Sequence, residues 1–291
     1  ITRDITSETN IFILSDKKGD CGDLYTVNEV PHGNVSKVWY DSPTLKMQRR
    51  MTVYTPAGYD KGKDYPVLYL LHGAGGDEDA WTTLGRAQHI LDNLIATGKA
   101  KPMVVVMTNG NPNCQAAPGE WSAGMYVPSF NGYQGAKAVA TMDESFPDVM
   151  NYVESHYKVG KDKAHRAICG LSMGGGHSFD ISRRFPNKFD YVGLFSAGLH
   201  VGKTGDFRTD FYKMLQEDEE AKQQLATLFK NKPKLYWIGM GKTDFLYKST
   251  AGLRRYFDEK GYKYTYMETE GGHIWRNWRV YLTEFAQKIF K

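Results

Sequence analysis

A serine between two glycines is the residue of this chain best suited to nucleophilic chemistry. Residues 170–174 read Gly-Leu-Ser-Met-Gly, the G-x-S-x-G pattern of a sharp strand-to-helix turn that exposes the serine. An apolar run at 167–169 precedes the pattern, and a segment with helical spacing follows it. The dipole of such a helix favours negative charge at its N-terminus. Ser172 is therefore the predicted nucleophile.

A serine hydroxyl needs a base, and chains with this turn carry their triad in the order serine, acid, histidine. Three histidines follow Ser172: His177, His200 and His273. His177 lies one helical turn after the serine, too close along the chain to reach over the hydroxyl. His200 comes just beyond the next strand and is interpreted as a structural or rim residue. His273, between a strand-like segment and the last helix, is the predicted base.

The third member of such a triad holds the imidazole in the correct tautomer. Asp244 occupies the turn after the apolar run at 235–239 and is the predicted acid. Asp258 falls within a predicted helix, where a solvated carboxylate is the ordinary role. Glu270 lies too close to His273 along the chain to suit the orientation.

Acyl transfer places negative charge on the carbonyl oxygen, which backbone N–H groups can stabilise. One donor is expected from Met173 and the other from the glycine-rich loop at 70–76, where Ala74 is preferred and Gly73 is the alternative. The same loop lacks the spacing and the Lys-Ser/Thr ending of a phosphate loop, which argues against a nucleotide site.

These residues require a scaffold of alternating strands and helices. Continuous apolar runs predict strands buried on both faces, at 66–71, 103–107, 167–171, 191–195 and 235–238. Segments with helical spacing alternate with them, at 84–96, 146–156, 175–185, 211–229, 250–260 and 280–290. The alternation predicts an α/β fold with a mostly parallel central sheet and helices on both faces. Residues 35–40 and 49–54 predict an antiparallel N-terminal hairpin.

The composition excludes several other classes of protein. The 291 residues are 41% hydrophobic and 24% charged with a net charge of +4, and no basic run indicates a nucleic-acid partner. Three scattered cysteines predict neither a disulfide framework nor a metal site, and no cofactor is implied. No stretch reaches the ~20 apolar residues of a membrane span. Residues 1–30, polar and turn-rich, are expected to be an arm or linker, and residues 31–291 the catalytic domain. Because the chain starts at Ile1, we expect a processed product, so that a missing signal sequence does not argue against secretion.

Four segments, in this order and spacing, resemble carbohydrate esterase family one: residues 70–76 with Trp81, residues 170–175, Asp244, and Gly-Gly-His-Ile-Trp at 271–275. The resemblance runs from about residue 30 to the C-terminus. It implies an α/β-hydrolase fold, a Ser172–Asp244–His273 triad and oxyanion amides at Ala74 and Met173. Residues 31–33 resemble the start of the catalytic domain in relatives with an upstream carbohydrate-binding module. The family further implies secretion, or a periplasmic or cell-surface location, in a bacterium.

The family contains feruloyl esterases and acetyl xylan esterases, so the expected partner is a plant cell-wall polysaccharide or a feruloylated oligosaccharide. A feruloyl group needs flat apolar walls. Candidates for those walls are Trp121, Tyr126, Phe130, Leu246 and Trp275. They favour a feruloyl esterase over an acetyl xylan esterase. An acyltransferase and an S-formylglutathione-type thioesterase are alternatives of other classes.

Overall fold

A single mixed sheet organises the chain. The computed structural model describes residues 12–15, 19–112, 138–202 and 210–291. Their eight strands pair in the order β1-β2-β4-β3-β5-β6-β7-β8. The bounds are β1 Asn34–Ser42, β2 Met47–Thr55, β3 Val67–Leu71, β4 Val104–Thr108, β5 Arg166–Leu171, β6 Tyr191–Phe195, β7 Leu235–Gly241 and β8 Thr265–Thr269. β1 pairs antiparallel with β2 and β2 with β4, whereas every later pairing is parallel. The predicted hairpin and mostly parallel sheet are confirmed.

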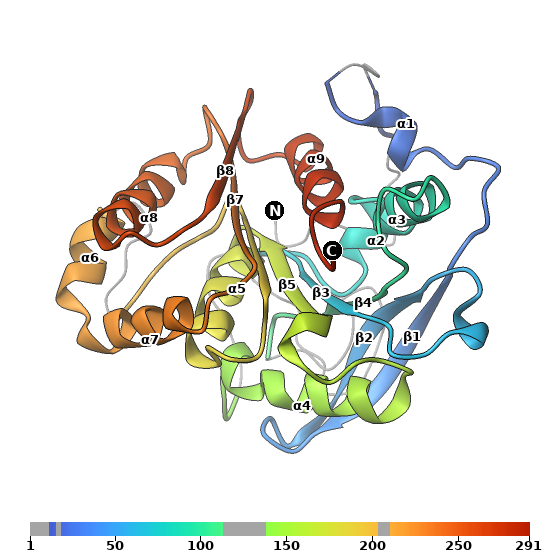
Figure 1. The fold of residues 1–291 in the computed structure, drawn as a ribbon, viewed down its shortest axis with the longest axis horizontal. Helices are drawn as coiled ribbons and strands as arrows, with labels where there is room; N and C mark the ends of the chain where they lie inside the picture. Colours follow the sequence, from blue (N-terminus) through green and yellow to red (C-terminus); the bar gives the residue numbers. More distant parts are fainter. Residues whose placement is uncertain (1–11, 16–18, 113–137, 203–209) are drawn as a thin grey trace.

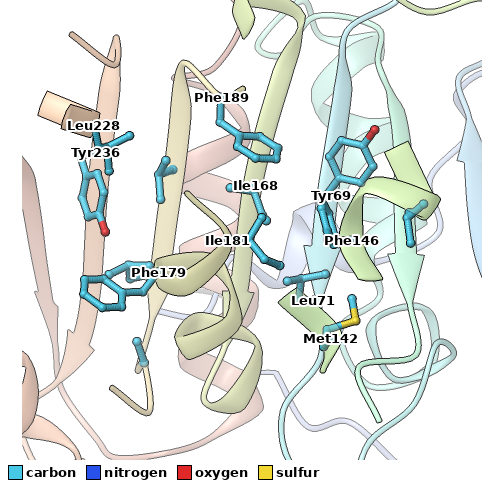
Figure 2. Packing of buried hydrophobic residues seen from close by; sticks show 14 of the residues in the cluster. Tyr69, Leu71, Met142, Phe146, Ile168, Phe179, Ile181, Phe189, Leu228 and Tyr236 are labelled. Carbon is cyan, nitrogen blue, oxygen red and sulfur yellow. The ribbon is translucent and has the colours of Figure 1, made fainter. Parts of the chain in front are cut away.

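Helices cover both faces of this sheet (Figure 1). Their bounds in the described residues are α1 Gly22–Tyr25, α2 Ala80–Thr83, α3 Ala87–Ala96, α4 Met142–His156, α5 Met173–Arg184, α6 Phe211–Glu217, α7 Glu219–Lys230, α8 Tyr247–Lys260 and α9 Trp275–Ala286. Alternate residues of each buried strand lie on opposite faces of the sheet and pack into two hydrophobic cores. Leu68 and Leu70 of β3 pack with α3 and α9. Tyr69 and Leu71 face the other core, which contains residues of α4, α5 and α7 (Figure 2).

Each predicted helical segment contains a helix, but several differ in extent or continuity from those observed. The helix predicted at 84–96 begins only at Ala87, because Arg86 has a positive φ of 55°, whereas α2 ends before the predicted range, at Thr83. The helix predicted at 211–229 is two helices, because Asp218 leaves the helical conformation and its side chain caps α7 by accepting from the Ala221 N–H. The last helix begins at Trp275, not at residue 280.

The described part of residues 1–30, the segment predicted to be an arm or linker, packs on α3. The Asn93 side chain donates to the carbonyls of Leu24 (2.6 Å) and Thr26 (3.0 Å), and it accepts from Asn28 at 3.0 Å. Tyr25 is buried. These contacts hold residues 24–28 against the domain. Within the described ranges, no helix has the length and apolar character needed to cross a bilayer.

Candidate active site

Ser172 stands at a strained turn between β5 and α5. Its φ of 53° and ψ of −115° lie outside the regions that non-glycine residues ordinarily occupy, at a cost of about 1–3 kcal/mol. Two backbone hydrogen bonds hold the turn: the Ser172 N–H donates to Phe195 at 2.9 Å, and the Gly198 N–H donates to the Ser172 carbonyl at 2.8 Å. The end of β6 and the loop after it therefore fix the serine backbone.

The flanking glycines are required by close backbone approaches. A Cβ on Gly170 would lie 2.5 Å from the Gly174 carbonyl oxygen. A Cβ on Gly174 would lie 2.5 Å from the His72 carbonyl oxygen, on the loop after β3. Any side chain at either position would push strand, helix and loop apart. The G-x-S-x-G pattern thus has the structural context that the sequence predicted.

Asp244 and His273 form a hydrogen-bonded pair beside this turn. Nδ1 of His273 lies 2.9 Å from Oδ2 and 3.1 Å from Oδ1 of Asp244, whose side chain is buried. Oδ1 also accepts from the Leu246 N–H at 2.9 Å. Because a carboxylate can only accept, Nδ1 carries a proton, and in the neutral ring Nε2 therefore presents a lone pair. This is the tautomer that a general base requires.

The pairing follows from the sheet. β7 and β8 are neighbouring parallel strands, so the loops after them emerge at the same edge. The Lys242 N–H donates to Thr269 at 2.9 Å and the Thr243 N–H donates to Gly271 at 3.0 Å, which ties the two loops together. Residues 29 positions apart are thereby placed in contact.

Two aromatic rings enclose the imidazole of His273. The Phe245 ring centroid lies 4.6 Å from that of His273, and the Trp278 ring meets it edge-on at 4.9 Å. Trp278 was missed in the sequence analysis. Its signal is the spacing from Trp275, three residues earlier on the same helix and in contact with it at 5.1 Å.

Ser172 and His273 line one cavity of about 710 Å³. Its other walls are Gly73, Ala74, Leu171, Met173, His177, Gly198, His200, Phe245, Leu246, Ile274, Trp275 and Trp278. Among the described residues, no hydrogen bond joins the Ser172 hydroxyl to His273. Hydrogen bonds between a nucleophile and its base are often long in ligand-free sites and shorten when substrate binds. The predicted wall residues Leu246 and Trp275 are present here, whereas Trp121, Tyr126 and Phe130 lie outside the described residues.

A tight turn brings the second predicted oxyanion donor to the cavity. The Gly76 N–H donates to the Gly73 carbonyl at 3.1 Å, and Gly75 supplies the positive φ of 83° that this turn needs. Within the described residues, the N–H groups of Ala74 and Met173 have no hydrogen-bond acceptor, although both residues line the cavity. Gly73, the alternative donor, lines it too. Unpaired amides at this place are available to an oxyanion.

His72 supports that turn from below. Its Nδ1 donates to the Gly73 carbonyl at 2.7 Å and its Nε2 accepts from the Gly110 N–H at 2.8 Å. Burial lowers the pKa of His72, so the ring is neutral and keeps one donor and one acceptor. His72 therefore has a local hydrogen-bonding role in this loop.

His177 reaches the cavity although its backbone lies on α5. Burial, together with the neighbouring His72, lowers the pKa of His177 to about 4. The ring is neutral near pH 7, and in the part of the chain that the structure describes its Nδ1 has no hydrogen-bond partner. It forms part of the cavity wall rather than pairing with a carboxylate.

Comparison with known proteins shows which proteins this chain is similar to. The family model named Esterase matches residues 42–289. An endo-1,4-beta-xylanase/feruloyl esterase of Xylanibacter ruminicola is 32% identical over 272 residues, which cover 90% of this chain and 32% of that protein. The chain therefore spans about a third of that relative's length.

Solved structures of ferulic acid esterases also align with most of this chain. A ferulic acid esterase aligns with a TM-score of 0.70 and 25% identity, covering 88% of this chain and 97% of its own. A CE1 ferulic acid esterase from Anaeromyces mucronatus, solved with ferulic acid, aligns with a TM-score of 0.68 and 24% identity, covering 92% and 95%. The predicted α/β-hydrolase fold and the resemblance to carbohydrate esterase family one are confirmed.

Proposed function

Because this chain belongs to the Esterase family and is a carboxylic ester hydrolase, we propose that it cleaves feruloyl esters of plant cell-wall arabinoxylan through a covalent acyl-serine. The observation that carries the proposal is the shared cavity: a serine on a strained turn and a histidine paired with a buried carboxylate line the same space. That combination is the arrangement by which an ordinary hydroxyl becomes a nucleophile.

In the first step, His273 Nε2 takes the proton of Ser172 as Oγ attacks the ester carbonyl. The resulting imidazolium keeps its Nδ1 proton and is stabilised by Asp244, which stays ionised. The new oxyanion accepts from the free amides of Ala74 and Met173, each donor contributing about 3 kcal/mol to transition-state stabilisation. His273 then protonates the departing sugar alcohol. Water, deprotonated by the same ring, attacks the acyl-serine and releases the acid.

The choice of ester rests on the cavity walls. Phe245, Leu246, Ile274, Trp275 and Trp278 make one side of the cavity apolar and aromatic. A cavity of about 710 Å³ is within the range of drug-sized ligand sites and far exceeds the needs of an acetyl group. The names of the relatives, a xylanase/feruloyl esterase and ferulic acid esterases, support the same substrate class. We accordingly propose that the protein acts on plant cell walls outside the cell.

Replacement of the nucleophile tests the mechanism. Ser172→Ala is expected to abolish hydrolysis of both methyl ferulate and p-nitrophenyl acetate, because no oxygen remains to form the acyl-enzyme. Ser155→Ala, which alters an exposed serine on α4, is the matched control and should keep full activity. Near wild-type turnover by Ser172→Ala would eliminate this nucleophile.

A comparison of substrates tests the specificity. Rates on feruloylated arabinoxylan are expected to exceed those on acetylated xylan and on S-formylglutathione. A higher rate on acetylated xylan would assign the enzyme to the acetyl esterases, and a higher rate on the thioester to the thioesterases. Formation of a new ester from an added alcohol acceptor, in place of free ferulic acid, would show a transferase.

A further inference from the structure

Two histidines and an aspartate meet at the edge of the domain, among residues that the esterase mechanism does not use. His89 and Asp92 lie three residues apart on α3, which places them on the same helix face. His32 approaches them from the segment just before β1. One side-chain ligand atom from each of the three lies within 4.8 Å of the other two. It is the one cluster of metal-ligating side chains within the ranges that the structure describes.

The spacing is close to that of a bound metal ion. The Nδ1 of His32 lies 2.9 Å from Oδ2 of Asp92. In a tetrahedral zinc site with bonds near 2.0–2.1 Å, neighbouring ligand atoms are about 3.3 Å apart. Two of the ligand atoms are thus within a few tenths of an ångström of the required separation, and the third needs only a modest side-chain movement.

His89 has a nitrogen without a partner. Its Nδ1 is buried and makes no hydrogen bond among the described residues. A buried polar atom in that state is destabilising unless something binds it. A metal ion bound through this nitrogen would satisfy it.

Asp92 is already held as a metal ligand would be. Its Oδ1 accepts from the Tyr54 hydroxyl at 2.7 Å and from the Gly33 N–H at 2.8 Å. These bonds fix the carboxylate and leave Oδ2 directed at His32. Hydrogen bonds of this kind orient the ligands in metal sites and are often as important as the ligands themselves.

We propose that His32, His89 and Asp92 bind one Zn²⁺ ion, with water completing the coordination. Two imidazoles and one carboxylate suit zinc, whereas Ca²⁺ and Mg²⁺ prefer oxygen ligands alone. On binding, zinc takes the place of the proton between His32 Nδ1 and Asp92 Oδ2, and the neutral ring keeps its single proton on Nε2.

The ion would have a structural role. His32 belongs to the segment that leads into β1, and residues 24–28 of the same segment are held on α3 by Asn93. Zinc at this place would strengthen the attachment to α3 that the bonds of His32 and Gly33 to Asp92 already make. Neither His32 nor His89 lines the catalytic cavity, so the ion is not part of the ester chemistry.

Calorimetric titration of the EDTA-treated, untagged chain with ZnCl₂ tests the proposal. Wild type is expected to bind one Zn²⁺ per chain, and His89→Ala and His32→Ala should each weaken binding at least tenfold. His165→Ala is the matched control, because His165 is also a partly exposed histidine beside an aspartate, Asp162, but has no third metal-ligating side chain near it among the described residues. The control should bind zinc as wild type does.

A thermal melt gives a second measurement. At a zinc concentration one hundred times the dissociation constant, the melting temperature of wild type should rise by about 4 °C, and that of His89→Ala should not. His32 is 47% exposed, so its replacement is expected to leave the fold intact, which unchanged hydrolysis of p-nitrophenyl acetate would verify. Absence of zinc binding in wild type would overturn the proposal, and so would equal binding in wild type and both histidine variants.

Discussion

Asp244→Asn is the substitution whose effect follows most directly from the structure. The Leu246 N–H donates to Oδ1 of Asp244 at 2.9 Å and would retain the amide oxygen of an asparagine there. The amide NH₂ would then face Nδ1 of His273. An NH₂ group can only donate, so Nδ1 must become an acceptor and the ring proton must move to Nε2. The base at Ser172 would thereby lose its lone pair.

The expected loss in kcat is about 10³–10⁴-fold, as for other triads whose acid becomes an amide. At 1.36 kcal/mol per factor of ten, this corresponds to about 4–5.5 kcal/mol of transition-state stabilisation. KM should stay near the wild-type value, because Asp244 does not line the cavity. A loss confined to kcat would indicate that Asp244 acts through His273 rather than on substrate.

Steady-state kinetics on methyl ferulate measure both constants, with circular dichroism as a check of folding. Glu270→Gln is the matched control, because this exposed carboxylate pairs with Lys242 and lies near His273 along the chain. It should keep kcat within about twofold. A folded Asp244→Asn enzyme with kcat within tenfold of wild type, or a severe loss in Glu270→Gln, would refute the assignment of the acid.

Three other predictions concern the surroundings of the site. Glu78→Gln should lower the free energy of unfolding by about 3 kcal/mol, measured by urea denaturation, because it removes the negative charge that lies 2.7 Å from the buried Arg50. Glu284→Gln, in an exposed pair, should cost less than about 1 kcal/mol. The pKa of His177 is about 4 in the folded chain against about 6.5 in the unfolded chain, so on acidification the unfolded chain takes up the proton first. Between pH 6.5 and pH 4, the free energy of unfolding should therefore fall by up to about 3 kcal/mol more in wild type than in His177→Gln. Equal pH profiles of the two proteins would contradict this. Phe245→Ala should raise KM for methyl ferulate several-fold and KM for p-nitrophenyl acetate less, because the ring forms part of the apolar cavity wall. Equal effects on both esters would argue against a feruloyl pocket there.

Local patterns were sufficient for much of the fold and for the proposed nucleophile. Five residues are enough to encode the turn at Ser172. Its two flanking glycines are needed because backbone atoms of the strand, helix and neighbouring loop come too close for a side chain. The buried strands were equally readable, because a strand covered on both faces must be apolar at every position. The order serine, acid, histidine along the chain then predicted Asp244 and His273 as the other two members of the triad.

Contacts between distant segments were decided by tertiary structure. That Asp244 and His273 touch depends on β7 and β8 being neighbours in parallel register, which no short window of sequence specifies. His32 contacts Asp92, which lies 60 residues further along the chain, and no sequence spacing typical of metal ligands predicts that contact. The physical reason is that local patterns report the period and burial of one element, whereas the pairing of elements is set by how all of them together cover the two faces of the sheet.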